Sequence, residues 1–265
     1  MTDIRFGTSG WRAIIAEEFT FANVARVLDA LVLLLRNNSL DSSPVIVASD
    51  ARFLAARFRA AAAEHFARNG IDVLLTPRSC PTPVVSVMIR AHELAGGINF
   101  TASHNPAEYQ GIKFSPANGA PAPKDMTDDI VSLLDQPVAP VQAEGTITDI
   151  DPREEYFTEL AKFIDTDALR AAGLAIGCDL LYGAGRGYLD EFLRRAGARV
   201  TVFHDEDNPS FGGRRPEPAP ENIDDLIAFM RDGDADIGLA TDGDADRFGI
   251  VDSDGTFYTP NQVLC

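Results

Sequence analysis

Apolar segments of strand length alternate with amphipathic segments of helix length along most of this chain. The run 44–49 (PVIVAS) has the composition of a buried strand, and the segment 53–69 has a helical periodicity that ends at Gly70. The alternation also includes a helix at 24–35, strands at 71–75 and 97–101, and a helix at 84–91. Strands that alternate with helices of this length predict a layered α/β domain, in which reactive groups gather where strands end.

A second unit repeats this alternation after the segment 135–151, which lacks helical periodicity and is interrupted by prolines. We interpret that segment as a linker. The elements expected after it are helices at 154–163, 187–195 and 222–231, strands at 174–182, 199–204 and 237–241, and a hairpin at 248–258. A chain of 265 residues is long enough for two domains. The sequence therefore predicts two α/β domains with a boundary near residue 145.

The charge balance limits the partners of the chain. Its 40 acidic and 23 basic residues give a net charge of −17, the wrong sign for binding nucleic acid or an anionic membrane. A phosphorylated ligand would need a locally basic pocket. The first residues lack an apolar signal core, and the longest apolar run, 31–35, is too short to span a bilayer, so we expect a cytoplasmic protein. Cys80, Cys178 and Cys265 are expected to be ordinary thiols.

The string TASHNP at 101–106 follows an apolar strand and precedes a glycine-led segment that contains Lys113. The hydroxyl of Ser103 could carry a phosphoryl group as a covalent intermediate, and His104 or Lys113 could move protons. The alternative is a turn in which serine and asparagine side chains cap backbone groups. For an arbitrary string of this kind the turn would be favoured, so the choice depends on the rest of the chain.

Asp242, Asp244 and Asp246 alternate along a loop that follows a predicted strand. Three carboxylates in this arrangement can converge on a hard divalent cation such as Mg²⁺ or Ca²⁺. The alternatives are a solvated acidic turn and a calcium EF-hand. The EF-hand does not fit, because Arg247 replaces its glycine, Ser253 stands where its closing glutamate is required, and the flanking segments are strands.

Three weaker patterns allow a structural interpretation. The string GAGRG at 183–187, with Asp205 further on, imitates a dinucleotide-binding fingerprint, but Tyr188 stands where a third glycine is required, and a tight strand-to-helix turn is favoured. The string GTSGWR at 7–12 could be a flexible loop. The string SDAR at 49–52 could be a surface ion pair.

Taken together and in this order, five strings resemble the α-D-phosphohexomutase family: GTSGWR at 7–12, SDAR at 49–52, TASHNP at 101–106, GIKF at 111–114 and DGDADR at 242–247. The segments 183–189 and 211–222 are also similar to the family's second domain. The resemblance implies an α/β fold of two consecutive three-layer α/β/α domains with mixed sheets. It assigns 1–145 to a domain with the phosphoserine loop, 146–256 to a domain with the metal loop, and 257–265 to the start of a third domain.

The resemblance also implies the roles of individual residues. Ser103 matches the phosphorylated serine, and its phosphate would complete a Mg²⁺ site with Asp242, Asp244 and Asp246. The other matched residues are His104 and Lys113, for proton transfer and transition-state support, and the active-site cations Arg12 and Arg247, the latter for phosphate binding. The implied enzyme is an isomerase, an intramolecular phosphotransferase. It would interconvert hexose 1-phosphate and hexose 6-phosphate, of glucose or mannose, through a hexose 1,6-bisphosphate that also serves as activator.

Family members are roughly twice as long as this chain, with a third and a fourth domain that recognise the sugar hydroxyls and the non-reacting phosphate. We therefore expect this chain to be the N-terminal half, to have as partners a hexose phosphate and those two further domains, and to be inactive alone. Three alternatives stay open: a phosphoglucosamine mutase, a metal-dependent sugar phosphatase that uses the same phosphoserine, and a non-catalytic module that binds a divalent ion or a sugar phosphate.

Overall fold

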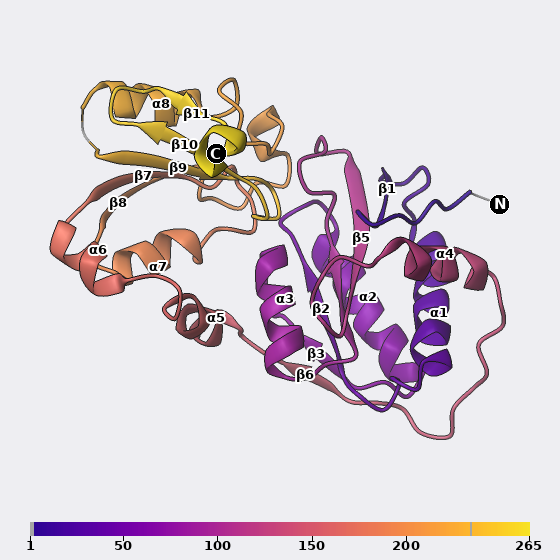
Figure 1. The fold of residues 1–265 in the computed structure, drawn as a ribbon. Coiled ribbons are helices and arrows are strands. Elements are labelled where there is room, and N and C mark those ends of the chain that lie inside the picture. Colours follow the sequence, from indigo (N-terminus) through magenta and orange to yellow (C-terminus); the bar gives the residue numbers. More distant parts are fainter. Residues whose placement is uncertain (1–2, 234) are drawn as a thin grey trace. The chain divides into compact units, whose positions relative to one another are not determined.

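The chain forms two α/β units in a computed structural model that describes residues 3–233 and 235–265. The first unit comprises the residues up to Ala102 together with Glu108–Pro152. The second unit comprises Arg153–Cys265 and, in addition, the loop Ser103–Ala107. Each unit is a sheet with helices packed on it (Figure 1). A five-residue segment from the first part of the sequence therefore belongs structurally to the second unit.

The first unit is built on a mixed sheet with the strand order β1-β5-β4-β2-β3-β6. Its strands are β1 (Trp11–Ile14), β2 (Val45–Ser49), β3 (Val73–Leu75), β4 (Gly96–Phe100), β5 (Tyr109–Pro116) and β6 (Ile147–Asp149). Its helices are α1 (Phe21–Asn37), α2 (Ala55–Arg68), α3 (Thr82–Ala91) and α4 (Lys124–Leu133). Strands β2, β3, β4 and β6 are parallel, and β5 and β1 are antiparallel to their neighbours. The strand order reverses at β2, which places the carboxyl ends of β2 and β4 where ligands bind in sheets of this kind.

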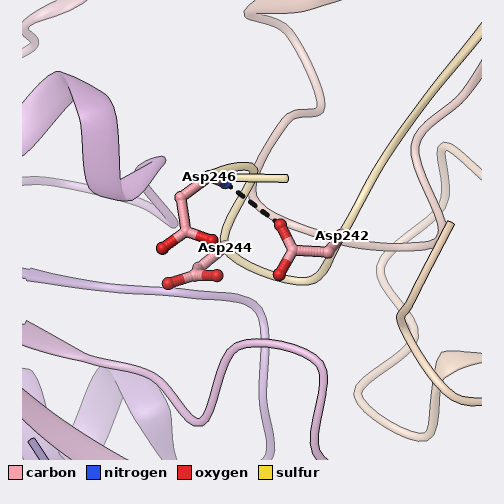
Figure 2. A group of neighbouring side chains, drawn as sticks. All are labelled: Asp242, Asp244 and Asp246. Atoms are coloured by element: carbon pink, nitrogen blue, oxygen red, sulfur yellow. Dashed lines mark hydrogen bonds between the residues drawn. The ribbon is translucent and has the colours of Figure 1, made fainter. Parts of the chain in front are cut away.

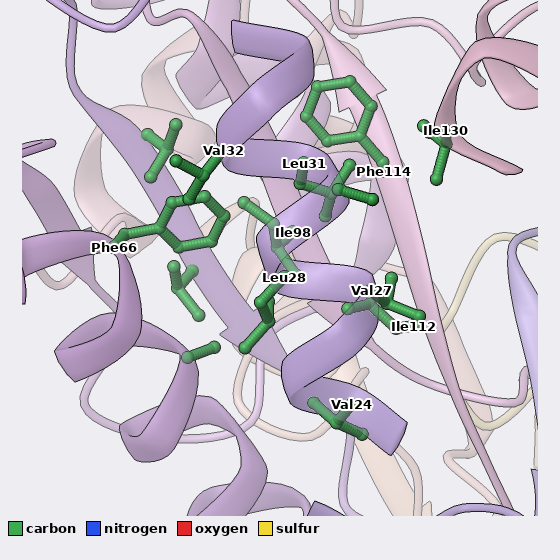
Figure 3. Close-up of a cluster of buried hydrophobic side chains, with 14 of the residues drawn as sticks. Val24, Val27, Leu28, Leu31, Val32, Phe66, Ile98, Ile112, Phe114 and Ile130 are labelled. Carbon is green, nitrogen blue, oxygen red and sulfur yellow. The ribbon is translucent and has the colours of Figure 1, made fainter. Parts of the chain in front are cut away.

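Helices cover both faces of this first sheet. Every residue of β2 and β4 is buried, as expected for parallel strands between two helical layers. On one face, the apolar side of α1 meets Phe66 of α2 and side chains of β4 and β5 (Figure 3). On the other face, α3 packs so closely that a Cβ on Gly97 would lie 2.7 Å from Val85 and 2.8 Å from Ile89. This packing fixes the positions of the ends of β2 and β4, which are followed by polar residues.

The second unit has a smaller mixed sheet with the strand order β11-β10-β9-β7-β8. Its strands are β7 (Ala175–Asp179), β8 (Arg199–Phe203), β9 (Ile237–Thr241), β10 (Phe248–Asp252) and β11 (Phe257–Tyr258). Its helices are α5 (Arg153–Leu160), α6 (Thr166–Ala172), α7 (Leu189–Arg195), α8 (Asp224–Arg231) and α9 (Pro260–Leu264). Strands β7, β8 and β9 are parallel, whereas β10 and β11 are antiparallel additions at one edge. Leu226 of α8 packs close to Gly177 of β7 and Gly238 of β9.

The expected α/β fold with two consecutive mixed-sheet domains is confirmed, and most expected elements are present. The strand predicted at 174–182 ends at Asp179, because the chain turns there with positive φ angles at Leu181 and Tyr182. The segment 135–151, interpreted as a linker, contains β6, which pairs with β3 and is held by Asp72 through the amide and hydroxyl of Thr146, both at 2.7 Å. The domain limits inferred from the sequence remain predictions. Within the described residues, no helix combines the length and hydropathy needed to cross a bilayer.

Candidate active site

The three aspartates of the DGDADR string lie in the loop that joins β9 to β10. The two strands are antiparallel neighbours, with Thr241 paired to Phe248, so the loop is a tight reversal. Ala245 has a φ of 55°, a left-handed conformation that is uncommon for a residue with a side chain. One carboxylate oxygen from each of Asp242, Asp244 and Asp246 lies within 4.8 Å of the other two (Figure 2). The loop thus gathers three carboxylates at the end of a buried strand.

Asp242 accepts hydrogen bonds at both of its carboxylate oxygens. Its Oδ1 accepts hydrogen bonds from the backbone N–H groups of Asp246 and Arg247, each at 3.0 Å. Its Oδ2 accepts a hydrogen bond from the Ser103 hydroxyl at 2.9 Å. The side chain is completely buried, and so is that of Asp244, whereas Asp246 is exposed. Buried and anchored carboxylates of this kind contradict the solvated acidic turn as an interpretation of this loop.

The electrostatics of the loop favour a bound cation. Burial, followed by repulsion from Asp244 and Asp246, raises the pKa of Asp242 to about 8, although the hydrogen bonds from Ser103 and from the Arg247 backbone act in the opposite direction. Clustered carboxylates keep their charge at neutral pH when a divalent cation compensates it. The three oxygen donors fit Mg²⁺, which is held by carboxylate and phosphate oxygens. Strands flank the loop on both sides, so the EF-hand is excluded by the fold as well.

Ser103 lies in the same unit as the three aspartates. It follows β4 by three residues, is buried, and has a φ of 52°. Strained backbone at a non-glycine residue is typical of functional loops. Its Oγ lies 2.9 Å from Asp242 Oδ2 and 3.4 Å from Nδ1 of His104. The backbones also approach closely, because a Cβ on Gly243 would lie 2.7 Å from the carbonyl oxygen of Ser103. A glycine is therefore required at position 243 for the two loops to meet.

Arg12 and Lys113 lie in the first unit, on the antiparallel side of its sheet. Arg12 of β1 is paired with Gly111 of β5, and Lys113 is paired with Asn99 of β4. Residues directly opposite each other in a sheet share a face, so Arg12 lies on the face of Gly111. Lys113 is two residues after Gly111 on the same strand and therefore lies on that face as well. A Cβ on Gly111 would lie 2.3 Å from the carbonyl oxygen of Thr101 and 3.0 Å from Cγ of Arg12. The structure therefore brings Ser103 and His104 to the carboxylates within the second unit, and groups Arg12 with Lys113 within the first.

Arg247 differs from the other candidate cations because its side chain is exposed. Its backbone N–H donates to Asp242, while its Nη1 lies 3.7 Å from Glu217. A groove of about 440 Å³ begins at Asp246 and Arg247. The remaining lining residues are mostly prolines and phenylalanines: Glu217, Pro218, Ala219, Pro220, Phe248, Phe257, Thr259 and Pro260. The guanidinium group is thus placed to meet an anion that approaches the loop from solvent.

The structure identifies a buried ion pair in the first unit that the sequence suggested only as a surface pair. Nε of Arg52 lies 3.1 Å from Asp50 Oδ2, and both side chains are fully buried. Arg52 also donates from Nη1 to the carbonyl oxygen of Tyr109 at 3.0 Å. The interpretation as a surface pair is therefore wrong. The sequence signal for the burial of this ion pair is its position directly after β2, a strand of five apolar or small residues.

A second pair, between a buried aspartate and a half-buried histidine, was missed by the sequence analysis altogether. Asp179, at the end of β7, lies 2.9 Å from Nδ1 of His204, which follows β8. The other ring nitrogen of His204 lies 3.3 Å from Asp225 of α8. Burial raises the pKa of Asp179, while the hydrogen bond with His204 lowers it. These contacts connect two strand ends to a helix, and only the parallel pairing of β7 and β8 brings them together.

The geometry agrees with comparisons to known protein families. The profile described as phosphoglucomutase/phosphomannomutase, alpha/beta/alpha domain I, matches residues 3–138. The profile for alpha/beta/alpha domain II of the same family matches residues 154–255. The two mixed-sheet α/β units of this chain, the second of which places a serine beside a carboxylate loop, therefore match the two domains of this family in order. The chain belongs to the phosphoglucomutase/phosphomannomutase family of the α-D-phosphohexomutase superfamily, whose members are metal-dependent isomerases that use a phosphoserine.

Individual relatives carry several names. A protein of Methanopyrus kandleri, provisionally named phosphoglucosamine mutase, is 31% identical over 259 residues, covering 98% of this chain and 56% of its own length. Phosphoglucomutase 1 of Drosophila melanogaster is 32% identical over 293 residues, covering 97% of this chain and 52% of its own length. A crystal structure of a Thermus thermophilus protein, provisionally assigned as a phosphomannomutase, is 39% identical, has a TM-score of 0.91, and covers 99% of this chain and 60% of that one. The chain thus spans little more than half the length of these proteins.

Proposed function

We propose that this chain carries the phosphoryl-transfer centre of a phosphohexomutase, which interconverts the 1-phosphate and 6-phosphate of a hexose through a hexose 1,6-bisphosphate. The observation that carries the proposal is the hydrogen bond from Ser103 Oγ to Asp242 Oδ2 at 2.9 Å. It joins the candidate nucleophile to the candidate metal loop across 139 residues of sequence. A capping turn or an isolated acidic loop has no reason to form this contact.

The contact has a consequence for the phosphorylated form of Ser103. A phosphoryl group on Oγ adds a charge of about −1.5 to −2 beside the three carboxylates. That arrangement is repulsive unless a cation lies between them. We therefore propose that Asp242, Asp244 and Asp246 hold Mg²⁺ together with a phosphoserine oxygen. The ion would neutralise the charge that develops on the transferred group, which is the main requirement of phosphoryl transfer.

The chain's own residues have the following proposed roles. In the first transfer, the bond between phosphorus and Ser103 Oγ breaks, and phosphorus bonds to a hydroxyl oxygen of the sugar phosphate. His104, whose Nδ1 lies 3.4 Å from Ser103 Oγ, accepts the proton of that hydroxyl and delivers it to the Ser103 Oγ that leaves phosphorus. Lys113 and Arg12 stabilise the transferred group, and Arg247 binds the phosphate from the solvent side. In the second transfer the other phosphoryl group of the bisphosphate leaves its sugar oxygen and bonds to Ser103 Oγ, and the proton of the Ser103 hydroxyl passes through His104 to that sugar oxygen.

Phosphorylation of this chain by glucose 1,6-bisphosphate and Mg²⁺ tests the proposal directly. We expect peptide mass spectrometry to place one phosphate on Ser103 and none on this segment in Ser103→Ala. Ser253→Ala, which alters an exposed serine in the hairpin between β10 and β11, serves as a control and should label like the wild type. Phosphate confined to another residue, or unchanged labelling of Ser103→Ala, would refute the assignment. Full absence of labelling would favour a non-catalytic binding module.

Two outcomes of an activity assay separate the mutase from the phosphatase. Isomerised sugar phosphate identifies a mutase, whereas free phosphate without isomerisation identifies a phosphatase that uses the same serine. Because the chain spans little more than half the length of its relatives, one of those relatives should be assayed in parallel. We expect the 265-residue chain to isomerise glucose 1-phosphate much more slowly than that relative, since binding energy from the non-reacting parts of the substrate positions the reacting group.

The identity of the hexose has two candidates. The strings GTSGWR and TASHNP favour glucose or mannose, by the resemblance described above. A hexosamine phosphate is favoured by relatives such as the M. kandleri protein, which is named for phosphoglucosamine. The ratio of kcat/KM for glucose 1-phosphate, mannose 1-phosphate and glucosamine 1-phosphate distinguishes them. A ratio that favours glucosamine would replace the first candidate without affecting the assignment of Ser103.

A further inference from the structure

An exposed hollow lies on the outer side of the first unit, away from its sheet. Its volume is about 490 Å³, and its lining residues come from the start of α1 and from α2: Phe21, Ala56, Arg57, Ala60, Ala61 and Glu64. None of these residues belongs to the candidate active site. The hollow lies on the outward face of α2, where residues 57, 60, 61, 64 and 68 share one side of the helix. We call this face, with Phe21, the α2 surface.

The α2 surface exposes one large aromatic side chain. Phe21, which lines the hollow, is 43% exposed. Phe21 is also fixed in place, since its ring stacks on the buried Phe58 at a centroid distance of 4.3 Å. An aromatic ring that is held rigidly and left in contact with water is a typical anchor of a protein interface, because it loses little conformational entropy on binding. The surface therefore has the composition of a docking site.

The middle of the α2 surface is unusually flat. Ala56 and Ala60 are exposed, and Ala61 is half-buried, so no long side chain separates the helix backbone from an incoming partner. Small residues at the contact allow two helices to approach at the shorter end of the usual interaxial distances. The partner that fits this shape best is another helix that carries small residues at its own centre.

The charges on the surface identify that helix. Arg57 and Glu64 lie at equal distances before and after the midpoint between Ala60 and Ala61. If a second α2 helix crosses this midpoint in the antiparallel direction, each Arg57 faces Glu64 of the second copy. We propose that the α2 surface is an isologous interface between two copies of this chain, in which the same patch serves both partners.

The state of these charges in the single chain agrees with the proposal. Glu64 forms an i,i+4 ion pair with Arg68 at 2.5 Å. Among the described residues, no acidic group lies within ion-pair distance of Arg57. A second copy would give Arg57 a partner and extend the Glu64–Arg68 pair into a network. The net charge of −17 on each chain opposes association, so we expect a reversible dimer with a dissociation constant of roughly micromolar size.

Charge reversal across the proposed contact gives a specific test. Arg57→Glu alone places like charges opposite each other twice in the dimer, and so does Glu64→Arg alone. Sedimentation velocity should show each variant as a monomer, with the dissociation constant raised more than about tenfold. An equal mixture of the two variants should form heterodimers, because the two introduced charges then face each other as an opposite pair, and the unaltered Arg57 of one chain faces the unaltered Glu64 of the other. A merely local effect on folding cannot produce this recovery on mixing.

The controls use charges elsewhere on the same unit. Arg90→Glu alters an exposed arginine of α3 and should leave the dimer unchanged. Circular dichroism of each variant should match that of the wild type, and Ala60→Glu, which places a charge at the centre, should also dissociate the dimer. The proposal is overturned if the wild type stays monomeric at roughly millimolar concentration, the weak limit of specific association. It is equally overturned if the mixture stays monomeric, or if Arg90→Glu dissociates a dimer as strongly as Arg57→Glu.

Discussion

The two units bury different kinds of groups in their interiors. In the first unit, Phe58, Phe66 and Phe100 are fully buried, and the ring centroids of Phe58 and Phe100 lie 5.9 Å apart. In the second unit, the core on the α8 side is built from smaller side chains: Leu181, Ile223, Leu226, Met230, Ala235, Ala240 and Val251. Nearby, Asp179, Asp242 and Asp244 are completely buried. The first unit also buries a carboxylate, Asp50, but Arg52 compensates its charge, whereas the second unit gathers two buried carboxylates, Asp242 and Asp244, in one loop.

This difference has a physical consequence for stability. Apolar burial contributes about 25 cal/mol per Å² and is nearly independent of pH. A buried carboxylate destabilises the fold unless a hydrogen bond or a cation compensates its charge. The stability of the second unit should therefore respond to pH and to metal ions, while that of the first should respond mainly to changes in packing.

The largest expected effect is the loss of an aromatic ring from the first core. Phe58→Ala should lower the free energy of unfolding by about 3 to 5 kcal/mol, because a large cavity remains between Phe19 and Phe100. The matched change in the second unit, Met230→Ala, removes a smaller side chain and should cost less than Phe58→Ala, toward the lower end of the about 2 to 5 kcal/mol typical of such changes. Urea unfolding followed by hydrogen exchange measures both effects and assigns each to its unit. Equal costs, or a larger cost for Met230→Ala, would contradict the comparison.

The next effect is the pH dependence of the metal-free protein. The pKa of Asp242 is raised to about 8 in the folded state, whereas it is about 4 in an unfolded chain. Between these values the folded state binds a proton that the unfolded chain has released, so the free energy of unfolding should fall as the pH rises. We expect a loss on the order of a few kcal/mol from about pH 4 to about pH 8.

Thermal unfolding of the second unit with and without Mg²⁺ measures this dependence. Saturating Mg²⁺ should remove most of the slope, because the cation stabilises the charged carboxylates. Asp242→Asn has an amide that does not titrate, so the free energy of unfolding of the metal-free variant should depend less on pH. A metal-free protein whose stability rises over this pH range would show that the carboxylate cluster is compensated by other groups.

A smaller effect is expected for the second buried carboxylate. Asp244→Asn should weaken Mg²⁺ binding at least about tenfold and raise the stability of the metal-free protein by roughly 1 kcal/mol, since one repulsive charge is removed. Isothermal titration calorimetry gives the affinity, and chemical unfolding gives the stability. Asp252→Asn, an exposed aspartate at the end of β10, is the matched control and should change neither quantity. Unchanged Mg²⁺ affinity in Asp244→Asn would exclude the proposed metal site.

The smallest effects concern two helix caps, one in each unit. Thr20 caps α1 through Asn23 N at 3.2 Å, and Asp165 caps α6 through Ala168 N at 2.9 Å. Replacing either by alanine should cost about 1 kcal/mol of local helix stability. Because α1 is a core helix and α6 buries none of its residues, only Thr20→Ala should lower the global free energy of unfolding. Amide exchange in α6 should increase for Asp165→Ala, and an equal global loss for both would show that α6 unfolds together with the rest.

The sequence by itself determined which segments can become buried strands and amphipathic helices. The run 44–49 and the stripe at 24–35 were predicted correctly, because period and composition act over a few residues. The elements that it missed include β1, β5, β6, α4 and α6. The strands among them lie at or beside a sheet edge, where the pattern is not a continuous apolar run, and β6 forms only because β3 offers it an edge.

The sequence also determined the chemical groups available to the site, since Ser103 and the three aspartates are recognisable as strings. Only the tertiary structure decided that Ser103 Oγ lies 2.9 Å from Asp242 Oδ2, that Asp50 and Arg52 are buried, and that Phe21 is left in contact with solvent. The physical reason is that burial and distance are properties of the packed chain. They depend on strand order, crossovers and close backbone approaches between residues far apart in sequence, which no local periodicity encodes.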